Sequence, residues 1–133
     1  MNGVTLLDTG PLVSFLSDRD QHRAWVQEQW KQLRPPMLTC EPVLTEAVFL
    51  LKREGADTDP LFALLERGVI RLDLAIGAEH PALRALMRRY RDRPMSLADA
   101  CLARLSERYA TSRVFTLDGD FHSCADAGAV RSR

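Results

Sequence analysis

Lysine and cysteine are both scarce in this chain. The two lysines, Lys31 and Lys52, stand against 16 arginines. The three cysteines, Cys40, Cys101 and Cys124, form no CxxC pair, and this spacing is not that of a structural zinc site. An odd number of widely spaced cysteines is typical of reduced thiols, so we expect a cytoplasmic protein.

Long apolar runs, a net charge and a glycine-rich phosphate loop are absent as well. No stretch is long enough to span a bilayer, and the N-terminus lacks the basic and apolar segments of a signal peptide. We therefore expect no membrane association. The formal net charge is zero, so any binding of a polyanion must come from a local basic patch.

The composition is that of an ordinary globular domain. The 133 residues are 46% hydrophobic and 27% charged, which is enough apolar material for one hydrophobic core. We see no repeat, low-complexity segment or linker, and expect a single domain over residues 1–133.

Short apolar runs alternate with helical patterns along the chain. Strands are expected over 4–7, 37–39, 69–72 and 114–117, with a candidate fifth at Ala129 and Val130. Helices are expected from the turn of Pro11, over 20–33 and 41–53, from Pro60, from Pro81 and after a cap at Ser96. This alternation predicts an α/β fold with a parallel sheet, whose strand carboxyl ends meet at one edge.

Four carboxylates occupy positions where a folded chain rarely places a charge. Asp8 and Asp118 directly follow expected strands. Glu46 shares a helix face with apolar neighbours, and Asp99 shares one with Leu102. A carboxylate removed from water is costly unless it is paired or binds a metal.

Each of these acids also has an ordinary structural explanation. Asp8 can cap the helix that follows it, and Glu46 can pair with a distant arginine. Ser96 and Asp99 have the spacing of a capping box. Asp118 can belong to a polar turn.

Taken together, the four acids indicate a metal site at the sheet edge. Oxygen ligands alone favour Mg²⁺ or Mn²⁺, ions that activate water and stabilise charge on a phosphate. Thr116 and Thr9 are candidate hydroxyl partners, although Thr116 is also an ordinary β-branched strand residue. Asp120 lies further into its loop and is either an auxiliary acid or solvated.

The densest basic stretch begins in the helix expected from Pro81 and ends just before Ser96. It contains Arg84, Arg88, Arg89, Arg91 and Arg93. This stretch is either a clamp for an RNA backbone or a solvated helix face.

Four short motifs occur in a recognisable order. Leu-Asp-Thr ends a strand, Thr-Glu-Ala lies in a helix, Ser-Leu-Ala-Asp-Ala opens a later helix, and Phe-Thr-Leu-Asp-Gly-Asp-Phe follows a late strand. From Asp8 to Phe121 the chain resembles the PIN-domain ribonucleases, in particular the VapC-type toxins of toxin–antitoxin pairs. It departs from their pattern at Gly10, where a small polar residue is common.

The resemblance implies a fold and an activity. The fold would be a three-layer α/β/α sandwich with a central parallel sheet of four to five strands. Asp8, Glu46, Asp99 and Asp118 would bind Mg²⁺ or Mn²⁺ for RNA cleavage, with Thr116 as an accessory hydroxyl. Such proteins usually form homodimers and are inhibited by a small antitoxin protein.

Two other functions fit the acids. A receiver-like phosphoacceptor domain also gathers acids at strand ends, but it normally needs two adjacent acids after its first strand and a lysine near a late one. A catalytically inactive PIN fold that serves only as a binding module is the other alternative.

Overall fold

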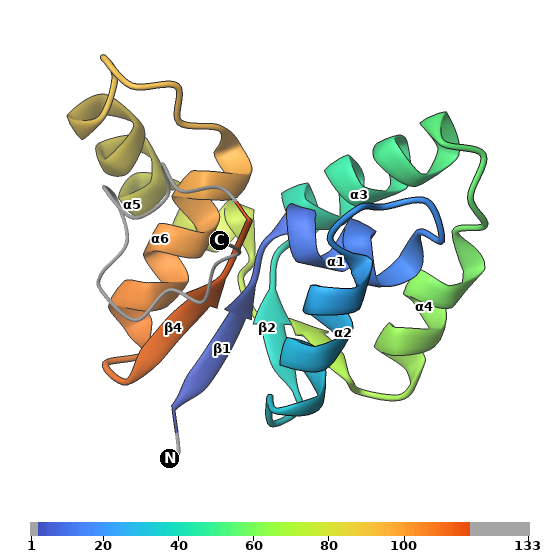
Figure 1. Cartoon of the computed structure of the whole chain (residues 1–133). Helices are drawn as coiled ribbons and strands as arrows, with labels where there is room; N and C mark the ends of the chain where they lie inside the picture. Colours follow the sequence, from blue (N-terminus) through green and yellow to red (C-terminus); the bar gives the residue numbers. More distant parts are fainter. Residues whose placement is uncertain (1–2, 118–133) are drawn as a thin grey trace.

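A parallel four-stranded sheet forms the centre of the part of the protein that the structure, a computed structural model, describes, residues 3–117 (Figure 1). The strands are β1 (Val4–Leu7), β2 (Met37–Thr39), β3 (Ile70–Leu72) and β4 (Ser112–Phe115). Their order is β3-β2-β1-β4, and every neighbouring pair is parallel. The predicted parallel α/β architecture is confirmed. The candidate fifth strand at Ala129 and Val130 lies outside the described residues.

Helices pack on the sheet in two groups. They are α1 (Thr9–Leu16), α2 (Arg23–Lys31), α3 (Glu41–Arg53), α4 (Asp59–Glu66), α5 (Ile76–Arg89) and α6 (Leu97–Arg108). Figure 1 shows α5 and α6 beside β4, and α1 to α4 grouped beyond β2. This is the predicted α/β/α sandwich. Within residues 3–117, no helix is long and apolar enough to cross a membrane.

The core lies where the two helix groups meet the sheet. Leu6 and Leu7 of β1 and Phe115 of β4 are fully buried, as expected for parallel strands that are covered on both faces. Phe15 and Trp30 stack with their ring centroids 3.9 Å apart and seal one side of this core. The burial of these apolar side chains is the main force that fixes the sheet edge described below.

The pairing register brings the carboxyl ends of the central strands together. Leu7 of β1 is paired with Phe115 of β4, and the backbone N–H of Asp8 donates to the Phe115 carbonyl at 3.1 Å. On the other side, the hydroxyl of Thr39 donates to the Leu7 carbonyl at 2.8 Å. The residues that directly follow these strands therefore share one edge of the sheet.

The predicted ends of three elements were wrong by two residues or more. The helix expected over 20–33 covers only Arg23–Lys31. It begins late because Asp20 lies in the preceding loop, where its carboxylate accepts from the Ser14 hydroxyl and the His22 N–H.

The helix expected to begin at Pro81 begins five residues earlier, at Ile76. Its first turn forms ahead of the proline, because the N–H groups of Ala78 and Glu79 both donate to the Ala75 carbonyl at 3.0 Å. Pro81 therefore interrupts the helix only by the one hydrogen bond that its nitrogen cannot donate.

The last strand was also placed too late. β4 covers Ser112–Phe115 rather than 114–117. Thr116 lies beyond the end of β4, and its hydroxyl donates a hydrogen bond to Asp8.

Candidate active site

Asp8 lies at the centre of the sheet edge, between β1 and α1. Its side chain is buried, with 8% of the residue exposed. Oδ1 accepts a hydrogen bond of 2.7 Å from the backbone N–H of Thr9, and Oδ2 accepts one of 2.7 Å from the Thr116 hydroxyl. Asp8 is thus a helix cap, as one explanation predicted. A carboxylate has about four acceptor positions, so lone pairs remain for a further ligand.

Glu46 reaches the same edge from α3. The Thr9 hydroxyl donates to its Oε1 at 2.8 Å, which ties the start of α1 to the middle of α3. The expected hydroxyl contacts of Thr116 and Thr9 are therefore both present, while their catalytic roles stay predictions. Within residues 3–117, Glu46 forms no ion pair, so the arginine partner considered from the sequence is not found there.

Asp99 comes to the edge in the first turn of α6. It forms the full capping box with Ser96: Oδ2 accepts from the Ser96 N–H, and the Ser96 hydroxyl accepts from the Asp99 N–H, both at 3.0 Å. The structural explanation drawn from the sequence is thus correct. The capping box does not exclude a second role, because it uses only one of the two carboxylate oxygens of the half-buried Asp99.

The electrostatics of Asp8 show that the three acids are neighbours. Burial raises the pKa of Asp8 from 3.8 to about 6, although the hydrogen bonds from Thr116 and Thr9 lower it. The negative charges of Asp99 and Glu46 raise this pKa further. Two helices that are distant in the sequence, α3 and α6, therefore bring negative charge close to the one buried carboxylate of Asp8.

A divalent cation fits the chemistry of this edge. The donors are oxygens, and their combined charge is negative with no cationic partner for Asp8, Glu46 or Asp99 within residues 3–117. In that part of the chain, however, no three acidic, histidine or cysteine side chains lie close enough to hold a metal ion by themselves. Asp118 and Asp120 lie outside the described residues. The described part thus supplies the negative charge but only part of a ligand set.

Two buried thiols lie behind the acids. Cys40 follows β2 and Cys101 lies in α6, both are fully buried, and their side chains are hydrogen-bonded to each other. That hydrogen bond and burial raise the pKa of Cys40, so its thiol stays protonated and packs as a small apolar group. The sequence could not show this contact, because nothing local links the two positions.

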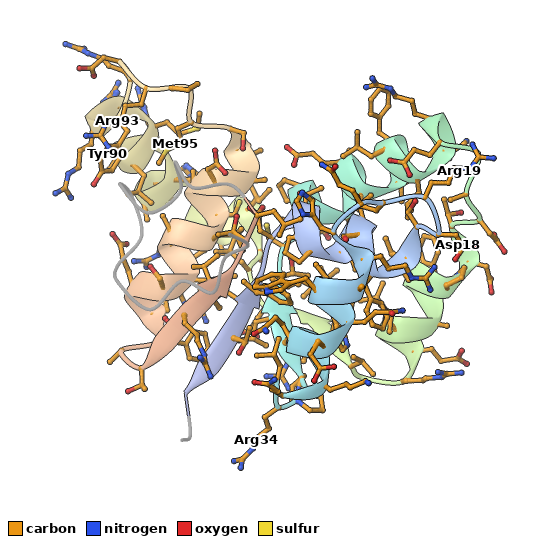
Figure 2. The ribbon with its side chains drawn as sticks, viewed as in Figure 1. Asp18, Arg19, Arg34, Tyr90, Arg93 and Met95 are labelled. Atoms are coloured by element: carbon orange, nitrogen blue, oxygen red, sulfur yellow. The ribbon has the colours of Figure 1, made fainter. Side chains whose placement is uncertain are left out.

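The five arginines predicted to bind RNA lie on α5 and just beyond it. Arg89 and Arg93 place their guanidinium carbons 5.3 and 5.4 Å from the ring centroid of Tyr90. Figure 2 shows Tyr90 and Arg93 projecting beyond the end of α5, toward solvent. Within residues 3–117, no acid pairs with any of these five arginines. Tyr90 was not predicted as part of this basic surface. Its position between Arg89 and Arg91 in the sequence could have indicated that an aromatic ring lies among the arginines.

A hollow lies away from the acids, near the C-terminal ends of α1 and α3. It measures about 530 Å³ and is lined by Asp18, Arg19, Arg23 and Glu54 among others. Its charges are already satisfied, since Arg23 pairs with Asp18 and the Ser17 hydroxyl donates to Glu54. Figure 2 shows Asp18 and Arg19 on the side of the molecule opposite Tyr90. We therefore place the candidate site at the acids.

Comparison with known proteins identifies the family of the chain. The family model described as "PIN domain" matches residues 5–127, so the chain belongs to the PIN domain family. Comparison with curated proteins found no match.

The fold is also similar to that of a solved toxin structure. Mycobacterium tuberculosis VapC20, described as a toxin that cleaves the sarcin–ricin loop, is 23% identical, with a TM-score of 0.78 over 96% of this chain and 99% of that one. The PIN assignment made from the sequence is confirmed, and nothing remains in favour of the receiver-like alternative.

Proposed function

We propose that this protein is a metal-dependent endoribonuclease. The observation that carries the proposal is the buried Asp8 carboxylate, which faces the charges of Glu46 and Asp99. Without a cationic partner among residues 3–117, such a group is unfavourable unless a ligand neutralises it. Membership of the PIN domain family supports nuclease chemistry at this edge.

Asp8, Glu46, Asp99 and Asp118 are the residues that would hold Mg²⁺ or Mn²⁺. When bound, such an ion lowers the pKa of a water and stabilises charge on the phosphate under attack. Thr116 and Thr9 orient the acids, because each hydroxyl donates to one carboxylate. Asp120 is proposed as an auxiliary acid.

RNA would approach across the basic end of α5. Arg84, Arg88, Arg89 and Arg91 supply charge for the phosphates, and the stack of Arg89 and Arg93 on Tyr90 suits unpaired bases. The chain from Tyr90 to Ser96 leads directly into the first turn of α6, which carries Asp99. A strand bound by these arginines would therefore be led toward the acids.

We also propose that the protein is the toxin of a toxin–antitoxin pair. The likeness of its fold to a VapC toxin supports this role. A small antitoxin protein and a second copy of the chain are the proposed partners, and the cytoplasm is the proposed compartment. Purification together with the product of the neighbouring reading frame would test the antitoxin.

The direct test is cleavage of an unstructured single-stranded RNA. We expect cleavage with Mg²⁺ or Mn²⁺, none with a chelator, and none from Asp99→Asn. Asparagine keeps an oxygen acceptor for the Ser96 N–H, so the capping box survives while the charge is lost. Glu66→Gln, which removes an exposed acid from the end of α4, is the matched control and should cleave like the wild type. Full activity of Asp99→Asn would refute the proposed site.

A further inference from the structure

A hollow of about 390 Å³ lies directly against the acidic edge. It is formed where the first turns of α3, α5 and α6 approach one another, and its lining includes Glu41, Pro42, Glu46, Ile76, Leu97 and Ala98. Its volume is in the range of roughly 300–1,000 Å³ that is usual for small-molecule sites. Because Glu46 belongs to both the hollow and the acidic edge, whatever fills the hollow lies beside the proposed reaction centre.

The walls of this hollow are apolar. Leu97, the first residue of α6, leaves 42% of its surface exposed, and Ile76, Pro42 and Ala98 line the same space. Pro42 and Ile76 are half-buried and Ala98 is buried, so Leu97 is the exposed member of this apolar lining. A concave surface lined mainly by apolar side chains is the usual form of a ligand site. Such walls suit the flat faces of an aromatic ring.

The charged groups of the hollow are the carboxylates of Glu41 and Glu46; its other polar side chain is Thr45, whose hydroxyl donates to the Glu41 carbonyl at 3.1 Å. Glu41 lies at the start of α3 and is exposed, and Glu46 accepts from Thr9 on the side of the acids. Two negative groups repel a phosphate. They accept hydrogen bonds, however, and a carboxylate is a suitable partner for the exocyclic amino group of a nucleobase.

We infer that this hollow binds one unstacked nucleobase of the RNA strand, next to the phosphate that is cleaved. The apolar walls hold the faces of the base, and the Glu41 carboxylate selects bases with an exocyclic amino group. Adenine, cytosine and guanine carry such a group, and uracil does not. The inference rests on the proposed ribonuclease function and adds the residues that choose the cut site.

The test maps cleavage of a random single-stranded RNA by sequencing the new ends. We expect wild-type cuts in which uracil is about tenfold rarer than cytosine at one flanking position, the discrimination of one good base contact. Glu41→Gln should bring this ratio close to one, because an amide both donates and accepts. Leu97→Ala should raise KM by about tenfold, and by more than it lowers kcat, as expected for lost binding contacts.

Phe62→Ala is the matched control. Phe62 is an apolar residue of α4 with 54% of its surface exposed, and it does not line the hollow. This variant should keep the wild-type profile, and circular dichroism should show that all three variants are folded.

The test distinguishes failure of the base site from failure of the proposed nuclease function. Metal-dependent cleavage by the wild type with an unchanged profile and KM in Glu41→Gln and Leu97→Ala would overturn the base site alone. The hollow would then be left to an apolar side chain of a protein partner. A wild-type protein that cuts no RNA with either metal would overturn the nuclease, and the base site with it.

Discussion

Two charged regions of this molecule differ in how their charges are arranged: one consists of ion pairs, and the other brings carboxylates close together. Between α5 and α6, Glu79 accepts from Arg104 Nε at 2.7 Å and lies 3.6 Å from Arg108 Nη1, while Arg104 also reaches Glu107 at 3.3 Å. At the sheet edge, Asp8 is surrounded by charge of its own sign. The first region neutralises itself and the second does not.

We interpret the first region as a structural cluster and the second as the proposed functional one. Partly exposed ion pairs such as those of Glu79 contribute at most about 1 kcal/mol each. The change in the pKa of Asp8 from 3.8 to about 6 corresponds to about 3 kcal/mol of destabilisation when the group is ionised. A folded chain retains such a cost where a ligand offsets it, as metal binding would do here.

Neutralising Asp8 should abolish activity. We expect Asp8→Asn to lower the RNA cleavage rate by about a thousandfold, since the metal's share of catalysis is several kcal/mol. Glu79→Gln, which removes a charge from the paired region instead, should stay within about threefold of the wild type. Single-turnover kinetics with Mg²⁺ would measure both variants, and comparable losses in the two would show that the regions do not differ in function.

The Asp8→Asn protein should also be more stable than the wild type. The folded pKa of Asp8 lies above its unfolded value, so the folded chain binds the proton more tightly. The cost of ionisation is present above about pH 6 and disappears as the pH falls toward 3.8. Asp8→Asn should therefore gain up to about 3 kcal/mol at pH 7.5 and almost nothing at pH 4.

Urea unfolding with chelator at both pH values measures this gain. Asparagine can keep both contacts, because its oxygen accepts from the Thr9 N–H and its amide can donate to the Thr116 hydroxyl. An equal loss of stability at the two pH values would mean that Asp8 acts only as a cap.

Removing the charge of Glu79, which lies among the ion pairs between α5 and α6, should change the unfolding free energy less than Asp8→Asn does, and should lower it rather than raise it. We expect Glu79→Gln to lose about 1 kcal/mol of unfolding free energy, because Arg104 and Arg108 lose a common partner. This loss should shrink in about 1 M salt, which screens such pairs. A stabilised Glu79→Gln protein would contradict the description of this region.

The sequence was sufficient to predict the parallel sheet and the proximity of Asp8, Glu46 and Asp99, but not the contacts that hold these side chains in place. Asp8 and Asp99 were found because each follows a recognisable local signal, a strand end or a capping box. The bond from Thr9 to Glu46 joins residues 37 positions apart, and Cys40 and Cys101, which also contact each other, are still further apart in the sequence. Such contacts depend on how α3 packs against α1 and α6, which local patterns do not encode.

The helix boundaries and the base hollow show the same limit. Pro81 was taken as a helix start because proline favours the first turn, but Ala75 accepts two N–H groups ahead of it. The hollow consists of the first turns of three helices, and Leu97 by itself looked like an ordinary apolar position. Asp118 and Asp120 keep their predicted roles as proposals.

Anomalous diffraction from a crystal soaked in Mn²⁺ would examine the acidic edge without reference to activity. Our account predicts a manganese peak coordinated by the carboxylates of Asp8 and Asp99. The same soak of Asp8→Asn should lose that peak. A wild-type crystal with no manganese within coordination distance of Asp8 would contradict the account.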